Sequence, residues 1–265
     1  MIEKVGILFK ILGFGLISKI LLRNNPGRVI LTHYVHRKDY LKFEKTILYL
    51  KNNFGFMSPN EFFDNMENRK KDSRILLTFD DGLLSAFDFT MEILSKHNIK
   101  AIFFIPTQSI GLTDELGLEF CYKQIYYQTK VKSDLTPEMY NFMPESAIKK
   151  LHDEGHFVCS HTDSHTQLIN LNENKILDHE LEYPIRKLAN ITGQERNAFA
   201  FPVGTEKNIS SFSFQGVVKY YKYCFSGLNG VPNFDEPLLI KRNCIHPEFS
   251  LNRVKLIVGG VYAVS

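Results

Sequence analysis

The stretch Ile75-Leu76-Leu77-Thr78-Phe79-Asp80-Asp81-Gly82 is the part of this 265-residue chain that best indicates its fold class. Its first five residues form a short, mostly apolar run, which is typical of a strand buried on both faces of a sheet. Asp80, Asp81 and Gly82 then end the run abruptly. In α/β folds the chemistry lies at the carboxyl ends of such strands, so the two carboxylates stand at a candidate active site. The alternative is a plain Asp-Asp-Gly turn, which is common.

Strand and helix patterns alternate along the rest of the chain. Apolar runs predict further strands at 28–35, 101–105, 156–160, 198–201, 223–226 and 238–243. Helical spacing and capping signals predict helices at 41–53, 85–97, 144–154 and 173–192. Ser58-Pro59-Asn60-Glu61 predicts one more helix start, with Ser58 and Glu61 as reciprocal caps. This alternation predicts an α/β fold with a mostly parallel sheet or barrel.

The composition is ordinary for a globular protein, with 44% hydrophobic and 23% charged residues and a net charge of +3. The basic residues do not cluster, so we expect no nucleic-acid partner. The cysteines contain no Cys-x-x-Cys pair, which argues against a structural zinc site. Cys159, Cys224 and Cys244 lie in apolar runs and are interpreted as small buried hydrophobic residues, which predicts a reducing compartment.

Residues 1–25 form an amphipathic segment ahead of the main domain, which we place at 26–265. Lys10 and Lys19 interrupt its apolar run, which is therefore too short to cross a bilayer, and it does not fit a signal peptide. Such a helix can lie in a membrane interface; a helix packed on the domain, or a poorly cleaved signal anchor, is the alternative. Residues 251–264 are a second candidate for peripheral membrane contact. We expect a cytoplasmic protein, at the inner face of the membrane if these segments bind lipid.

Two histidines follow the predicted strand at 156–160. His161 and His165 are four residues apart and can face one metal ion if the segment turns helically. Ser164 and Thr166 are then candidates for fixing the ring tautomers. Such a pair by itself is more often a surface or core pair than a ligand pair. With one carboxylate from the 80–81 pair, however, two histidines make a ligand set for zinc or another first-row divalent metal.

A third set of residues follows the predicted strand at 198–201. Pro202, Val203 and Gly204 form a Pro-x-Gly turn, which makes a rigid loop with exposed backbone N–H groups. Such groups can stabilise an oxyanion. The turn is weak evidence alone, but three signals at three strand ends in one α/β chain together predict an active site.

Three motifs resemble those of the polysaccharide deacetylase family, also called the NodB-homology family or carbohydrate esterase family 4. Thr78-Phe79-Asp80-Asp81-Gly82 looks like the first motif, and Ser160-His161-Thr162-Asp163-Ser164-His165 looks like the second. Phe199-Ala200-Phe201-Pro202-Val203-Gly204 is similar to the third motif as found in the branch that acts on surface and biofilm polysaccharides. The likeness runs from about Val29 to Arg242.

The resemblance implies a distorted (β/α) barrel of about seven strands, with Asp81, His161 and His165 as metal ligands and Asp80 as general base. It implies metal-dependent hydrolysis of the acetamide of an N-acetylated amino sugar, in a surface polysaccharide or a lipid-linked glycan. Zn²⁺ is the expected metal, with Co²⁺ and Ni²⁺ as alternatives. Two other functions stay open: a metal amidohydrolase acting on a non-sugar amide, and a non-catalytic carbohydrate-binding module with a decayed site.

The chain also departs from the family pattern. The arginine usual before the third-motif proline is absent and Ala200 stands there, which leaves open what orients Asp80. Val203 replaces the usual tyrosine, and the chain has no tryptophan, so the usual fourth motif is missing. The catalytic-acid histidine of the fifth motif has no clear match. His246 and His33 are the two candidates, and a packing role is the alternative for each.

Residues 111–142 are polar and tyrosine-bearing, with no strong period, which predicts a long insertion or lid. Tyr122, Tyr126 and Tyr127 are candidates for stacking on sugar rings. The alternative is that these tyrosines simply pack the insertion.

Overall fold

The computed structural model describes residues 26–171 and 173–260. This part of the chain contains a seven-stranded sheet in the order β6-β5-β4-β3-β2-β1-β7, in which all neighbouring strands are parallel. The strands are β1 (Arg28–Thr32), β2 (Ile75–Phe79), β3 (Ala101–Ile105), β4 (Phe157–Ser160), β5 (Ala198–Ala200), β6 (Tyr223–Phe225) and β7 (Asn243–Cys244). The predicted α/β class, a distorted (β/α) barrel of about seven strands, is confirmed.

The two edges of the sheet meet through the segment ahead of β7. The Ile240 N–H donates to the Cys224 carbonyl of β6 at 2.8 Å, and the Ile240 carbonyl accepts from the N–H of Ser226, directly after β6, at 2.9 Å. Strand β7 then pairs with β1 from Asn243 onward. The sheet therefore curls until one short stretch joins its two edge strands. The strand predicted at 238–243 is wrong in extent, because this stretch bonds first to β6 and then to β1 and is regular only at Asn243–Cys244.

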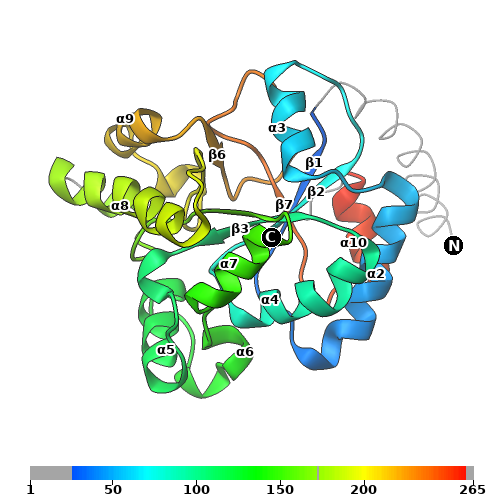
Figure 1. Cartoon of the computed structure of the whole chain (residues 1–265), viewed down its shortest axis with the longest axis horizontal. Helices are drawn as coiled ribbons and strands as arrows, with labels where there is room; N and C mark the ends of the chain where they lie inside the picture. The colour runs from blue at the N-terminus through cyan, green and yellow to red at the C-terminus, as the bar shows by residue number, and fades with distance from the viewer. Residues whose placement is uncertain (1–25, 172, 261–265) are drawn as a thin grey trace, which may run out of the picture.

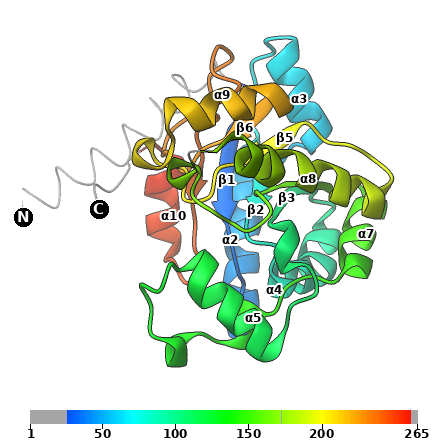
Figure 2. The same ribbon diagram turned by 90° about the vertical axis from the view of Figure 1, so that its left-hand side faces the viewer.

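Helices surround the sheet (Figures 1 and 2). They are α2 (Tyr40–Phe54), α3 (Pro59–Glu67), α4 (Leu84–Phe89), α5 (Asp114–Phe120), α6 (Pro137–Tyr140), α7 (Glu145–Asp153), α8 (Asn174–Thr192), α9 (Ser211–Tyr220) and α10 (Leu251–Val258). Helices α2, α4, α7 and α10 share one apolar cluster with β1 to β4, and α8 and α9 share another with β5 and β6. Helix α9 lies outside the helices that the sequence patterns predict.

Residues alternate along each strand between the barrel interior and the surrounding helices. Val29, Leu76 and Phe104 belong to the interior cluster, whereas their neighbours Ile30 and Leu77 pack against the helices. The interior is thus filled with apolar side chains along the length of the strands. The buried carboxylates and histidines that face the pocket follow the carboxyl ends of the strands, which places the chemistry at that rim.

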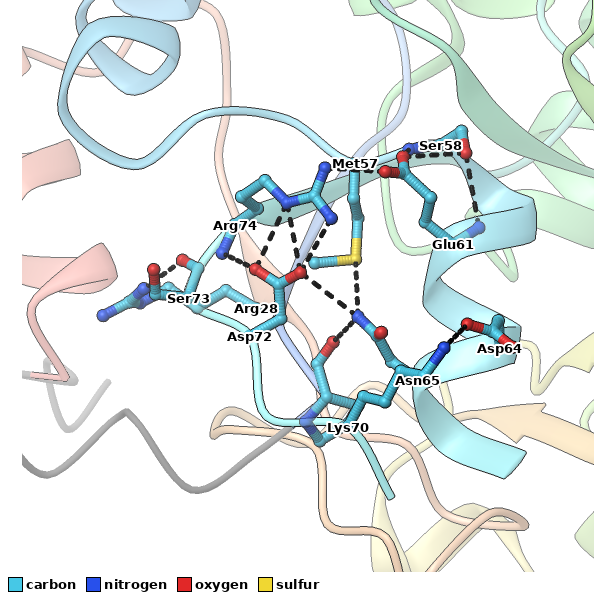
Figure 3. A network of polar contacts seen from close by, with 11 residues as sticks. Arg28, Met57, Ser58, Glu61, Asp64, Asn65, Lys70, Asp72, Ser73 and Arg74 are labelled. Carbon is cyan, nitrogen blue, oxygen red and sulfur yellow. Dashed lines mark hydrogen bonds and ion pairs between the residues drawn. The ribbon is translucent and has the colours of Figure 1, made fainter. Parts of the chain in front are cut away.

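A polar network lies at the amino ends of β1 and β2, away from that rim (Figure 3). Ser58 caps α3 as predicted: its side chain accepts from the Glu61 N–H, and the Glu61 carboxylate accepts from the Ser58 N–H at 2.8 Å. Arg74, directly before β2, donates to Glu61 at 2.8 Å, and Asn65 of α3 donates to the Pro26 carbonyl at 3.1 Å. The network ties α3 to the strands and serves the fold.

Residues 111–142 fold as short helices. Helix α5 continues as a π-helical turn over Cys121–Ile125, and α6 follows after a loop. Phe120, Leu135 and Phe142 form a small apolar cluster with Leu83 beside the barrel. The segment has no single hydrophobic period because its helices are short and separated by a loop.

None of the helices in the described ranges is long and apolar enough to cross a membrane. The predicted amphipathic segment, residues 1–25, lies outside the described residues. In the second candidate segment, α10 buries Val254 and Val258 in the core cluster that it shares with α2, while Leu251 and Leu256 are 38% and 37% exposed. Core packing therefore accounts for part of the apolar character of this segment.

Candidate metal centre and active site

The turn after β2 directs two carboxylates to the same place. Leu76 faces the barrel interior, so strand alternation puts Asp80 on that face as well. Asp81 and Gly82 then adopt left-handed φ angles of 71° and 68°, an uncommon conformation for a non-glycine residue. The left-handed turn breaks the alternation, and Asp81 also ends up in the pocket at the carboxyl ends of the strands.

His161 and His165 meet the second of these carboxylates. Each ring directs its Nε2 atom at Asp81 Oδ1, at 3.5 Å from His161 and 3.3 Å from His165. One ligand atom from each of the three buried residues lies within 4.8 Å of the others. The segment between the histidines is not the predicted helical turn: Thr162 and His165 have φ angles of 63° and 61°. A tight left-handed turn, rather than helical spacing, brings the two rings together.

Backbone carbonyls orient both imidazole rings. Nδ1 of His161 lies 2.8 Å from the Ala200 carbonyl oxygen, and Nδ1 of His165 lies 2.7 Å from that of Gln124. Each Nδ1–H therefore donates to a carbonyl, which turns both Nε2 atoms toward Asp81, where they can donate a proton to the carboxylate or, when deprotonated, bind a metal ion. The prediction that Ser164 fixes a ring tautomer is wrong, because its hydroxyl group donates elsewhere.

That hydroxyl group donates to Glu180, a buried residue on α8. The Glu180 carboxylate accepts from Ser164 Oγ at 2.7 Å and from the backbone N–H groups of Asp163 and Ser164 at 3.0 and 2.9 Å. It therefore holds the loop that carries both histidines. Among the described residues Thr166 makes no hydrogen bond to either ring, so its predicted role in orienting the rings is wrong as well.

The electrostatics of the cluster favour a cation. Burial alone would raise the pKa of Asp81, but hydrogen bonds from His161 and His165 hold that pKa well below its usual range. One ionised carboxylate and two imidazole Nε2 atoms, converging on a pocket, form a ligand set that fits zinc or a similar divalent ion.

Arg242 orients the carboxylate of Asp80, for which the third motif offers no arginine. Its two terminal nitrogens donate to the two oxygens of Asp80, both at 2.7 Å, and its Nε donates to the Ser226 carbonyl at 2.9 Å. Both side chains are buried. Arg242 therefore orients Asp80 from a different strand end than the family pattern predicts. The sequence signal for it was the polar stretch Lys241-Arg242-Asn243, which interrupts an apolar run.

The Pro-x-Gly loop offers one backbone donor to the pocket. Pro202 has no N–H, and the Gly204 N–H donates to the Pro202 carbonyl at 2.6 Å. Val203 has a left-handed φ angle of 61° and lines the pocket, and its N–H has no partner among the described residues. A Cβ at Gly204 would lie 2.5 Å from the backbone N of Gly227, so the loop is packed closely against its neighbour. Of the three predicted oxyanion residues, Val203 supplies the available N–H.

The family model of polysaccharide deacetylases matches residues 67–214, which is more than half of the chain. The chain belongs to the polysaccharide deacetylase family. The matched region contains the Asp-Asp-Gly turn, the two histidines and the Pro-x-Gly loop, so the resemblance seen in the sequence is confirmed. No curated protein sequence matches the chain significantly.

Solved structures of deacetylases share the fold of this family member. IcaB from Ammonifex degensii matches with a TM-score of 0.68 at 17% identity, over 88% of this chain and 97% of that one. The Streptococcus pyogenes deacetylase PplD, in complex with acetate, matches with a TM-score of 0.67 at 18% identity, over 87% and 97%. A polysaccharide deacetylase from Bacillus cereus matches with a TM-score of 0.65 at 21% identity, over 88% and 68%. At these identities the likeness establishes the fold.

The two candidate acid histidines of this deacetylase lie side by side, outside the matched region. The rings of His33 and His246 stack with centroids 6.2 Å apart, and Cys244 Sγ lies 3.6 Å from His246 Nε2. Burial by itself would lower the pKa of His33, but the hydrogen bond with Cys244 and the charges of Asp81 and Asp80 raise it to about 9. The interpretation of Cys244 as a buried hydrophobic residue is wrong, because its sulfur is a polar partner of both rings.

These groups line a pocket of about 240 Å³. Of the three tyrosines in the insertion, Tyr126 lines it. Tyr127 instead donates its hydroxyl to the His165 carbonyl at 2.8 Å, and Tyr122 packs within the insertion. The insertion of this deacetylase thus supports a metal-ligand candidate as well as forming one wall of the pocket. A larger open groove of about 880 Å³ adjoins the pocket and shares Tyr34 and Lys130 with it.

Proposed function

We propose that the protein removes the acetyl group from an N-acetylated amino sugar, using a divalent metal ion held by Asp81, His161 and His165. The observation that carries the proposal is the convergence of these ligand atoms within 4.8 Å, beside a carboxylate that Arg242 orients. An acetamide is a poor electrophile with a poor leaving group. Hydrolysis therefore needs groups that activate the carbonyl and the attacking water, and a group that protonates the departing amine.

Each residue has a distinct task in this proposal. A metal ion bound at the site would acidify water and polarise the acetyl carbonyl, which are the two contributions of a hydrolytic metal. Asp80 accepts the proton of the attacking water. The Val203 N–H donates to the oxygen on which negative charge develops. The products are acetate and a free amine.

His33 is the better candidate for the acid that protonates the departing amine. The charges of Asp81 and Asp80 act on it, and its pKa of about 9 means that it carries a proton at neutral pH. A charged imidazolium at the pocket wall is the state a general acid requires. His246 also lines the pocket, and we assign it the role of packing against the His33 ring on which it stacks.

We further propose a surface polysaccharide or a lipid-linked glycan as substrate, handled on the cytoplasmic face of the membrane. Support comes from the third-motif resemblance and from the open groove beside the pocket, which offers room for sugars flanking the reacting one. The four free cysteines agree with a reducing compartment. Vesicle co-sedimentation of the full chain and of a chain lacking residues 1–23 tests the membrane part; equal binding by both would remove the N-terminal anchor.

The decisive experiment is acetate release by the full-length chain after chelation, with zinc, cobalt or nickel added back. The substrates are N-acetylglucosamine oligomers and lipid-linked N-acetyl sugars, with Asp81→Asn as the control. Release that metal restores in the wild-type chain alone supports the proposal. Hydrolysis of simple non-sugar acetamides without release from any glycan would favour the amidohydrolase, and glycan binding without hydrolysis would favour the binding module.

A further inference from the structure

Strand pairing brings three reactive side chains together at the rim of the pocket. Leu31 of β1 is in register with Cys244 of β7, and the ladder continues with a 2.8 Å hydrogen bond from the Ile245 N–H to the Leu31 carbonyl. His33 and His246 follow two residues after Leu31 and Cys244, so they lie on the same face of the sheet as those two residues. This explains why their rings stack with an interplanar angle of only 16°.

The sulfur of Cys244 lies against the stacked pair of rings. It is 3.6 Å from Nε2 of His246, whose ring stacks on that of His33, and a hydrogen bond to the same sulfur is the largest influence that raises the pKa of His33. Beyond these contacts, His33 faces the charges of Asp81 and Asp80 from the turn after β2. Cys244 is therefore a third group, besides Asp81 and Asp80, that favours the charged form of the His33 ring.

We propose that Cys244 is a positioning residue for the proton donor. Its sulfur holds one nitrogen of the His33 ring and leaves the other nitrogen for the departing amine. In its thiolate form, Cys244 also stabilises the imidazolium. This inference rests on the proposed function, and it assigns to a cysteine the task of keeping a half-buried acid oriented and charged.

The charge state of the sulfur supports this assignment. Burial alone would raise the pKa of Cys244, but hydrogen bonds with His246 and His33 lower it to about 6. Burial raises the pKa of both Cys121 and Cys159 to about 12. At neutral pH Cys244 is therefore an anion that faces the imidazolium of His33, unlike these two thiols.

Three variants of the full-length, metal-loaded chain test the role. We expect Cys244→Ala to lower kcat by about tenfold or more, with KM and metal content nearly unchanged. In the pH profile of kcat, the midpoint of the alkaline limb should move about one pH unit lower, because the imidazolium loses an anionic partner. Cys244→Asp, which restores an anion, should recover that limb, whereas Cys244→Ser should not. An unchanged limb in Cys244→Ala, or full recovery in Cys244→Ser, would overturn the inference.

A second measurement does not depend on turnover. The ultraviolet absorbance of the Cys244 thiolate is titrated as the difference between the full chain and Cys244→Ala. We expect a midpoint near pH 6, moving upward in His33→Asn. A midpoint near the ordinary cysteine value overturns the inference even in an active enzyme. A different outcome is that the thiolate titrates as expected but the protein releases no acetate from any glycan. That outcome would overturn the proposed function and the catalytic role of Cys244, but it would leave the contact between Cys244 and His33 in place.

Discussion

At the scale of single residues, two adjacent carboxylates have different partners and therefore different tasks. Asp80 pairs with Arg242, whereas Asp81 faces the Nε2 atoms of His161 and His165. The two carboxylates point to different partners in one pocket because the backbone at Asp81 is left-handed.

Asp80→Asn should therefore remove catalysis and spare metal binding. We expect kcat to fall by roughly 10²–10⁴, the usual contribution of a general base, with metal stoichiometry unchanged. Acetate release and metal analysis of the same preparation check this. Asp81→Asn is the matched control and should lose the metal; near-normal turnover in Asp80→Asn would show that the base is another group.

Arg242→Lys should separate the orientation of Asp80 from its charge. A lysine keeps the positive charge but cannot donate two parallel hydrogen bonds to one carboxylate. We expect kcat to fall by about 10-fold to 100-fold, since a misplaced catalytic group loses rate steeply. The kinetics, metal content and unfolding midpoint of the variant are compared with wild type. Wild-type turnover would mean that Asp80 needs no guanidinium.

At the scale of elements, α8 supports the metal-ligand loop through Glu180. Glu180→Gln should weaken metal binding by about 10-fold to 100-fold, as the loss of an outer partner of a metal site usually does. A competition titration with a zinc chelator measures the dissociation constant. Glu182→Gln is the matched control, because Glu182 lies on the same helix and pairs with Arg186. Equal zinc affinity in both variants would contradict a supporting role for Glu180.

The start of β4 carries a group that makes stability depend on pH. Burial lowers the pKa of His156 to about 4, and its Nδ1 accepts from the Ala101 N–H at 3.1 Å. The unfolded chain binds this proton near pH 6.5 and the folded chain only near 4, so stability falls as pH falls between these values. The loss is about 3 kcal/mol of unfolding free energy.

His156→Asn should flatten this part of the stability curve, because its side-chain oxygen can take the place of Nδ1 without titrating. Urea unfolding of both chains at several pH values between 4 and 7 measures the difference in slope. His152→Gln, on the neighbouring helix α7, is the control. Parallel curves for wild type and His156→Asn would show that His156 is not the titrating group.

At the scale of the whole molecule, the metal-ligand candidates come from β2 and β4, so metal binding should stabilise the entire barrel. At a free metal concentration 100 times its dissociation constant, binding contributes about 2.7 kcal/mol. For a domain of this size that corresponds to a rise in Tm of about 5–10 °C. Calorimetry of the chelated chain with and without zinc measures the rise. If zinc raised the Tm of His165→Gln by the same amount, the metal would bind at a site other than the one that contains His165.

The sequence by itself determined what depends on local patterns. Ile75–Phe79 and Ala101–Ile105 are strands over the predicted residues, because an apolar run of five residues between turn signals is too short for a buried helix and suits a buried strand. The Ser58 cap is equally local. The three motifs also sufficed to indicate the family.

Only the tertiary structure decided what depends on closure of the barrel. Asp80 and Arg242 are 162 residues apart in the chain, and no local pattern relates them. The meeting of Cys244 with His33 likewise follows from the register of β7 against β1. The boundaries of that last strand could not be predicted, because its hydrogen bonds go to two different neighbours in turn. Contacts between distant strand ends are set by how the sheet curls, and that curl is a property of the packed molecule rather than of any stretch of its sequence.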